Sequence, residues 1–97
     1  MTKKAYIVVD ARSTDPERMA DYRSLAQVAV EKHGGRYLVR GAPYETLEGR
    51  WQPQRLVMLE FPSMDAARGF YDSPEYKAAR AARAGVSDFD MLLAEAY

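Results

Sequence analysis

The fold is decided by residues 55–63, RLVMLEFPS, the most strand-like stretch of the sequence. Its β-branched and long apolar residues predict a strand over residues 55–61, which Pro62 ends. Successive side chains of a strand point to opposite faces, so this strand presents two sets of side chains. The first set is Val57, Leu59 and Phe61, and the second is Leu56, Met58 and Glu60. Both sets are mainly apolar, so the sequence predicts a sheet that is covered on both faces.

Three more strands are predicted on either side of this one. Apolar and β-branched runs place them at residues 5–9, 36–40 and 89–94. In the first of them, Ile7 and Val9 share one face while Tyr6 and Val8 share the other, so both faces are again apolar. Residues 10–14 are predicted to form a loop, and weak alternation predicts a short edge strand at residues 44–49.

Helices are predicted where a capping residue is followed by proline and an acid. Asp15 begins one helix that runs to about residue 33, and Ser73 begins another that runs to about residue 84. Ser63 caps a third helical segment. The order strand, helix, strand, strand, helix, strand is that of the ferredoxin-like split βαβ fold. We therefore predict one α+β domain over residues 1–97, with a four-stranded antiparallel sheet and its helices on one face.

Composition narrows the classes of function. The 97 residues include 14 Lys and Arg and 14 Asp and Glu, so the net charge is zero and no dominant basic field is available for nucleic acid. With no cysteine and one histidine, we expect no metal site and, since no phosphate-binding loop appears, no cofactor. The apolar run at residues 5–9 is too short for a signal peptide or a membrane span, so we expect a cytoplasmic protein without a membrane partner.

The second face of the sheet needs a partner, because the helices cover only the first. We predict that this partner is a second copy of the chain in an isologous homodimer; the alternative is a monomer that covers the face with residues 41–54 and its C-terminal residues. Residues 41–54 form a long connection between two strands. We predict that this connection is an arm that reaches the partner subunit with Trp51 as its anchor, or else a lid over a pocket.

Five motifs together resemble those of one family. They are GGRYLVRG (34–41), LEGxWxPxRLV (47–57), EFPS (60–63), AA (66–67) and FYxSPEY (70–76). As a set they resemble the domain of unknown function 1330 over nearly the whole chain. The resemblance implies a dimeric α/β barrel of ferredoxin-like fold. The same superfamily includes cofactor-free monooxygenases, muconolactone isomerases, haem-dependent chlorite dismutases and ligand-binding regulators, so the chemistry stays open.

Charged residues on the predicted strands are the first candidates for a site. Glu60 either pairs with Arg36, Arg40 or Arg55, or is desolvated with a raised pKa and acts as a general acid or base. Even spacing predicts that Arg36 and Arg40 lie on one face of the sheet, where they could bind a carboxylate ligand. Alternatively these two arginines pair with Glu60 and Glu48.

Aromatic residues and the single histidine complete the candidate site. His33 either caps the C-terminal end of the first helix or, as the one side chain that ordinarily titrates near neutrality, acts as an acid or base. The resemblance to haem-dependent relatives adds a third possibility, an axial ligand of haem. Tyr22, Tyr71, Tyr76 and Trp51 either line a ligand pocket or belong to the core and the long connection. We predict a domain that binds a small apolar or anionic ligand between sheet and helices. The alternative is a cofactor-independent monooxygenase or isomerase for a small aromatic or lactone-like substrate, with Glu60 as base, Arg40 as anion clamp and Tyr22 as hydroxyl donor.

Overall fold

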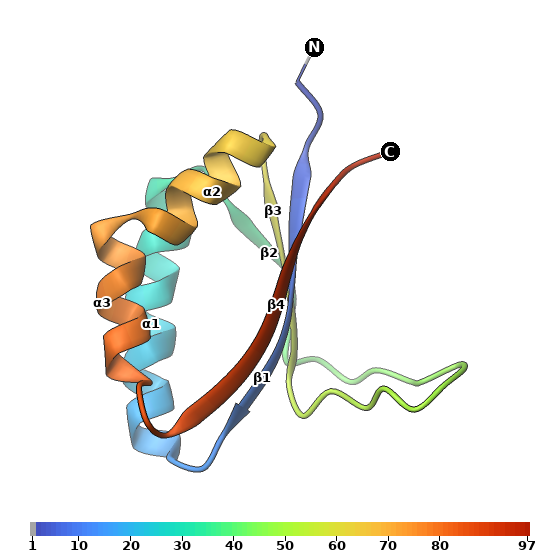
Figure 1. The fold of residues 1–97 in the computed structure, drawn as a ribbon, viewed down its shortest axis with the longest axis vertical. Helices are drawn as coiled ribbons and strands as arrows, with labels where there is room; N and C mark the ends of the chain where they lie inside the picture. Colours follow the sequence, from blue (N-terminus) through green and yellow to red (C-terminus); the bar gives the residue numbers. More distant parts are fainter. Residues whose placement is uncertain (1) are drawn as a thin grey trace.

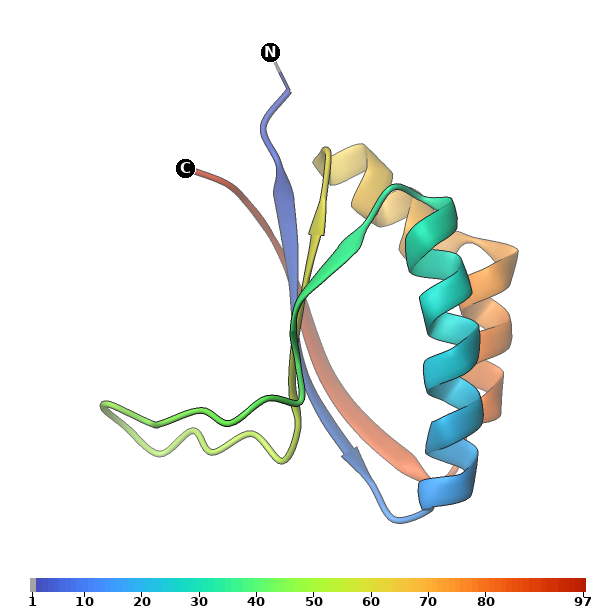
Figure 2. The ribbon, with the colours of Figure 1, turned by 180° about the vertical axis from the view of Figure 1, so that it is seen from behind.

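A computed structural model describes residues 2–97 and contains one antiparallel sheet with three helices. The elements in chain order are β1 (Ala5–Ser13), α1 (Pro16–Lys32), β2 (Arg36–Arg40), β3 (Leu56–Phe61), α2 (Met64–Asp72), α3 (Pro74–Ala82) and β4 (Ser87–Glu95). The strand order is β2-β3-β1-β4, with every neighbouring pair antiparallel. Figures 1 and 2 show all three helices on the same face of the sheet. The predicted ferredoxin-like α+β fold is confirmed.

Each helix begins at the predicted capping residue. The Asp15 side chain accepts a hydrogen bond from the backbone N–H of Arg18 at 3.1 Å, and Ser63 accepts one from Ala66 at 3.0 Å. Ser73 lies between α2 and α3 and serves both: its hydroxyl donates to the Phe70 carbonyl at 2.7 Å and accepts from the Tyr76 N–H at 3.1 Å. These bonds satisfy backbone groups that a helix end leaves without partners.

The core lies between the helices and the inner face of the sheet, which is the face that the helices cover. Ile7, Val9, Leu59 and Phe61 are all buried there, as their alternation predicts. Gly35 lies against this core, because a Cβ atom at that position would be only 2.6 Å from the tip of the Phe61 ring. The absence of a side chain therefore lets the turn before β2 approach the sheet closely.

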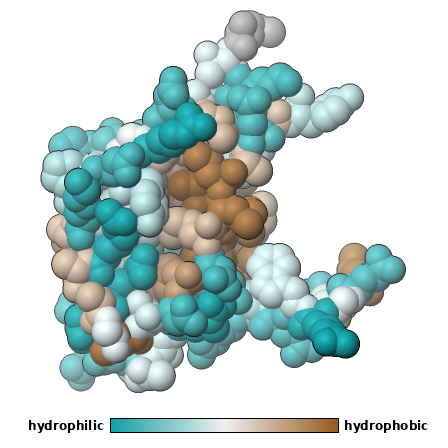
Figure 3. Space-filling model, in the orientation of Figure 1, coloured by the Kyte–Doolittle hydropathy of each residue, from teal (hydrophilic) through white to brown (hydrophobic). Residues whose placement is uncertain are grey.

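The opposite, open face of the sheet has no helix on it. It carries the half-buried side chains of Tyr6, Val8 and Met58 together with Leu92, which is 63% exposed. Residues 41–55 project on this side as a long excursion from the sheet (Figures 1 and 2). In Figure 3 apolar colour also gathers over β4, at the edge of the sheet. No helix within residues 2–97 is long and apolar enough to cross a membrane.

Three local predictions are wrong. Residues 10–13 extend β1 instead of forming a loop, because β4 begins at Ser87 and pairs with them. Residues 44–49 form no strand; side-chain hydrogen bonds hold this segment, from Tyr44 to the Pro53 carbonyl at 2.6 Å and from Thr46 to the Trp51 carbonyl at 2.7 Å. The pairing of β2 with β3 contains a bulge at Leu38, which alters the faces of the residues that follow.

Candidate functional site

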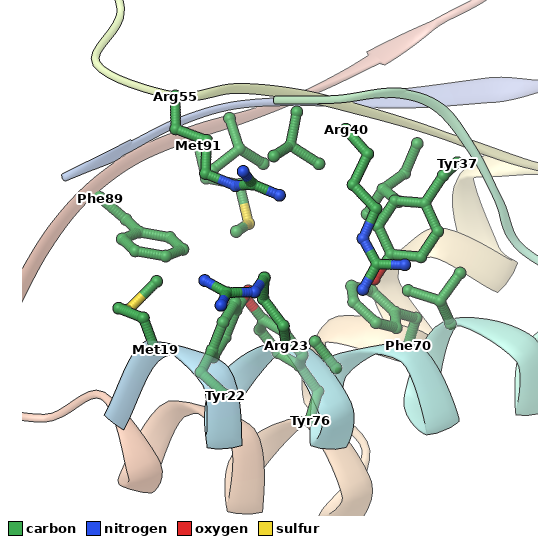
Figure 4. Close-up of a pocket in the computed structure, with 15 residues that line it drawn as sticks. Met19, Tyr22, Arg23, Tyr37, Arg40, Arg55, Phe70, Tyr76, Phe89 and Met91 are labelled. Atoms are coloured by element: carbon green, nitrogen blue, oxygen red, sulfur yellow. The ribbon is translucent and has the colours of Figure 1, made fainter. Parts of the chain in front are cut away.

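A cavity lies between the inner face of the sheet and α1 (Figure 4). The space in it that admits a water-sized molecule measures about 30 Å³, and the whole hollow, with the open solvent at its mouth, about 470 Å³. Most of its lining is apolar or aromatic. The lining residues are Val9, Met19, Tyr22, Arg23, Ala26, Val30, Tyr37, Arg40, Arg55, Val57, Leu59, Phe70, Tyr76, Phe89 and Met91.

Two tyrosine hydroxyls form the polar part of the cavity interior. The hydroxyl oxygens of Tyr22 and Tyr76 are 2.7 Å apart, so one donates to the other. Burial, together with the neighbouring Tyr76 hydroxyl, raises the pKa of Tyr22 far above its usual range. The ring of Tyr22 also packs edge-on against Phe89, with centroids 5.3 Å apart. This pair therefore supplies hydroxyl groups that can donate and accept hydrogen bonds.

Arg40 reaches the cavity because of the bulge in β2. Arg36 lies opposite Glu60 on the open face, whereas the register shift at Leu38 places Arg40 opposite Val57, which faces inward. The guanidinium carbon of Arg40 lies 4.2 Å from the centroid of the Tyr37 ring, and its Nη1 donates to Gln27 Oε1 at 2.9 Å. The prediction that Arg36 and Arg40 share a face is thus wrong, because a bulge breaks strict alternation.

Two further arginines approach the same space from opposite layers. Arg55 comes from the start of β3, and Arg23 comes from α1 (Figure 4). Burial and the neighbouring charges of Arg23 and Arg40 lower the pKa of Arg55. Gly41, with a φ of +71°, makes room for Arg55, because a Cβ atom there would lie 2.7 Å from the guanidinium carbon. The backbone next to Arg40 therefore leaves room for the Arg55 side chain.

The charge of the cavity is entirely positive. Its lining includes three arginines, and no aspartate, glutamate or histidine is found among its lining residues within the described part of the chain. None of the ion pairs formed within residues 2–97 involves Arg23, Arg40 or Arg55. Guanidinium groups present planar pairs of donors that suit carboxylate and phosphate oxygens. The arrangement can therefore hold an anion against an apolar interior.

Glu60 does not belong to this site. It lies on the open face, where Oε1 accepts from Arg36 Nε at 2.9 Å and lies 3.4 Å from Lys4 Nζ. The hydrogen bond from Arg36, with the Lys4 charge nearby, lowers the pKa of Glu60. The prediction of a general base with a raised pKa is therefore wrong: neighbouring cations stabilise the charged carboxylate. The alternative, a carboxylate paired with arginine, is the one observed.

The other predicted residues lie outside the cavity. His33 occupies the C-cap of α1, and its Nε2 is 3.3 Å from Glu75 Oε1. Trp51 is 57% exposed on the projecting segment and borders a shallow hollow on the open face with Val8 and Leu92. Tyr71 borders a groove between α2 and β4, with the Arg80 guanidinium 4.4 Å from its ring centroid. Of the predicted residues, Tyr22, Tyr76 and Arg40 are thus brought together.

Arg23 and Arg55 are the site residues that the sequence reasoning missed. Arg55 lies two residues before Val57, so strand alternation already assigns it to the inner face. Arg23 lies four residues after Met19, so helical spacing assigns it to the stripe of α1 that faces the sheet. Within residues 2–97, histidine, aspartate and glutamate side chains form no group of three that could hold a metal ion.

Comparisons with known proteins agree with this architecture. A protein of unknown function from Rhodopseudomonas palustris matches with a TM-score of 0.76 and 18% identity, over 100% of this chain and 85% of that protein's chain. A dimeric ferredoxin-like protein of unknown function from Thermobifida fusca matches with a TM-score of 0.68 and 18% identity, over 99% of this chain and 93% of that one. SnoaB, a cofactor-independent oxygenase from Streptomyces nogalater, matches with a TM-score of 0.67 and 14% identity, over 99% of this chain and 95% of the SnoaB chain.

These likenesses at low identity establish the fold. A search of curated proteins finds no significant match to the sequence. The family model for a domain of unknown function, DUF1330, matches residues 4–97, which is nearly the whole chain. The protein therefore belongs to the DUF1330 family.

Proposed function

We propose that the protein is a binding domain for small organic anions, which it takes up in the cavity between the sheet and α1. The observation that carries this proposal is the set of three arginines, Arg23, Arg40 and Arg55, at an apolar cavity whose lining within residues 2–97 includes no carboxylate. Arg23 and Arg55 are half-buried, whereas Arg40 is exposed. Charged groups that are partly removed from water are normally paired, so an uncompensated cluster favours a ligand of opposite charge. The aromatic walls favour a ligand with a flat apolar body.

The ligand enters with its apolar part first and leaves its anionic part among the arginines. The enclosed volume of about 30 Å³ holds only one or two water molecules, so an aromatic ring needs more room. Met19 and Met91 line the cavity and have flexible, adaptable side chains. Their movement, with that of the arginine side chains at the mouth, enlarges the space when the ligand binds.

Catalysis is the second candidate, because the fold is also that of the cofactor-independent oxygenase SnoaB. A cluster of guanidinium groups would stabilise a phenolate or enolate form of a small aromatic or lactone-like substrate, which is the reactive form for oxidation or isomerisation. Binding ranks first because the cavity lining within residues 2–97 offers no carboxylate or imidazole to accept a proton. Oxygen consumption with a panel of polyhydroxylated aromatic compounds tests the second candidate.

The test of anion binding compares two ligands of the same size, one charged and one neutral. Benzoate and the neutral benzamide share a ring, and we expect only benzoate to raise the melting temperature, since preferential binding stabilises the folded state. Arg55→Gln should remove the effect of benzoate. Arg68→Gln is the matched control, because Arg68 lies exposed on α2 beside Asp65 and outside the cavity. Equal stabilisation by both compounds, or an unchanged response of Arg55→Gln, contradicts the proposal.

The proposed functional unit is a homodimer formed through the open face. The apolar residues on that face and the projecting segment with Trp51 support a sheet-to-sheet contact between two copies. The Thermobifida fusca neighbour is described as dimeric, which also supports this assembly. Leu92→Lys should give a monomer by light scattering, whereas Val28→Lys, at a similarly exposed apolar position on α1, should leave the dimer intact. A wild-type monomer at micromolar concentration contradicts the assembly.

A further inference from the structure

We propose that the ligand of this cavity carries a compact head with two negative charges, such as a phosphate monoester or two vicinal carboxylates, on a flat apolar body. This inference rests on the proposed function and assigns the class of anion. The number of arginines that line the cavity, their shared place on it and the neutral partner of Arg40 support it.

The charge of the three arginines exceeds what one carboxylate can neutralise. A single carboxylate carries one negative charge, although its two oxygens can accept several hydrogen bonds. The cavity presents three guanidinium groups and, among its lining residues within 2–97, no anionic side chain. A singly charged ligand would therefore leave two net positive charges at the cavity. A doubly charged head neutralises most of the cluster and offers oxygens to all three arginines.

The three groups line one cavity. Figure 4 shows the guanidinium groups of Arg55 from the sheet and Arg23 from α1 facing each other, with that of Arg40 farther along the cavity, against the ring of Tyr37. The charges of Arg23 and Arg40 lower the pKa of Arg55, so Arg55 is repelled by both of them. Their place on one cavity favours a single compact head over two charges at opposite ends of a ligand.

Two arginines on the open face have carboxylate partners. Arg12 contacts Asp10, Asp88 and Asp90, and Arg36 contacts Glu60. Arg40 instead donates to a neutral amide oxygen of Gln27 at 2.9 Å, a bond that an incoming anion can replace with a stronger one. The charge of Arg40 is thus available to a ligand.

The experiment measures calorimetric affinities of the wild-type protein for four ligands with one benzene ring. Benzoate carries one charge, phthalate two adjacent carboxylates, terephthalate two opposed carboxylates, and phenyl phosphate a compact head that is doubly charged at pH 7.5. We expect phthalate and phenyl phosphate to bind at least about tenfold more tightly than benzoate, since a further charged hydrogen bond contributes at least that factor. Terephthalate should resemble benzoate.

The variant Arg23→Gln tests whether Arg23 contacts the second negative charge of the ligand. It should lower the affinity for phthalate and phenyl phosphate about tenfold and change that for benzoate less than about threefold, while Arg68→Gln changes none of them. Circular dichroism verifies that both variants are folded. Benzoate binding as tightly as phthalate and phenyl phosphate overturns the doubly charged head but preserves the proposed function. Binding of none of the four ligands overturns both.

Discussion

The two faces of the sheet differ in whether their cationic side chains have carboxylate partners. On the open face, Arg36 and Lys4 contact Glu60, and Arg12 contacts three aspartates, so cations and carboxylates compensate one another. On the inner face, three arginines meet at an apolar cavity that no carboxylate lines within residues 2–97. The net charge of zero conceals this difference. The distribution of charge between the faces, and not its sum, therefore indicates where a ligand binds.

One strand contributes to both faces. Arg36 and Arg40 are the first and last residues of β2, yet only Arg36 faces Glu60. The bulge at Leu38 inserts one residue into β2, so the side chains that follow it change face. Because of this single inserted residue, one arginine forms an ion pair on the open face and the other lines the cavity.

The largest expected effect distinguishes the packing of the two faces. Phe61→Ala removes a ring that is 1% exposed on the inner face, and we expect it to lower the free energy of unfolding by about 3–5 kcal/mol. Leu92→Ala on the open face should cost less than about 0.5 kcal/mol at concentrations where the protein is monomeric. Urea unfolding followed by circular dichroism measures both. Equal losses for the two variants would show that the open face is packed within the monomer.

The next effect concerns the backbone that supports the arginines. Gly41 and Gly49 have φ values of +71° and +90°, so alanine at either position should cost about 1–2 kcal/mol of stability. Only at Gly41 does a Cβ atom meet Arg55, since nothing lies within 4 Å of a Cβ atom at Gly49. Gly41→Ala should therefore also weaken benzoate binding, measured by calorimetry, whereas Gly49→Ala should not. Equal benzoate affinities of the two variants would mean that Arg55 does not contact the ligand.

The sequence predicted the architecture because each element has its own local signal. Asp15, Ser63 and Ser73 cap the helices where expected, and alternation correctly assigns Leu59 and Phe61 to the buried face. The boundaries of β1 were less predictable, since its last residues form a strand only through pairing with β4. Local spacing carries no information about such a partner.

The site was predictable in part. Alternation and helical spacing could have assigned Arg55 and Arg23 to inward faces, but their meeting depends on how α1 lies over the sheet. Even spacing could not predict the position of Arg40, because the sequence of β2 contains no signal for the bulge at Leu38. Tyr22 and Tyr76 were both candidates, yet their hydroxyl contact joins residues from two different helices.

A smaller effect tests the polar interior of the cavity. Tyr22→Phe leaves the buried Tyr76 hydroxyl without its partner at 2.7 Å, so we expect a loss of about 1 kcal/mol, and the same for Tyr76→Phe. The double variant leaves neither hydroxyl unpaired, and its loss should be smaller than the sum of the two. Urea unfolding of the four proteins gives the interaction energy. Strict additivity would mean that the two hydroxyls do not act as a pair.

The smallest expected effect lies on the open face, where the pair of Arg36 and Glu60 stabilises the fold without serving the ligand. The hydrogen bond from Arg36 lowers the pKa of Glu60 below its ordinary value of 4.5. A carboxyl whose pKa is lowered in the folded state adds stability above its unfolded pKa and loses it as the pH falls through the folded value. Unfolding measured from pH 7 to pH 3 should therefore lose less stability for Glu60→Gln than for wild type. Glu45→Gln, which changes an exposed carboxylate that forms no ion pair within residues 2–97, should follow wild type.

Because Glu60 faces away from the cavity, Glu60→Gln should bind benzoate at pH 7 as wild type does. A loss of affinity would mean that the open face also contributes to ligand binding.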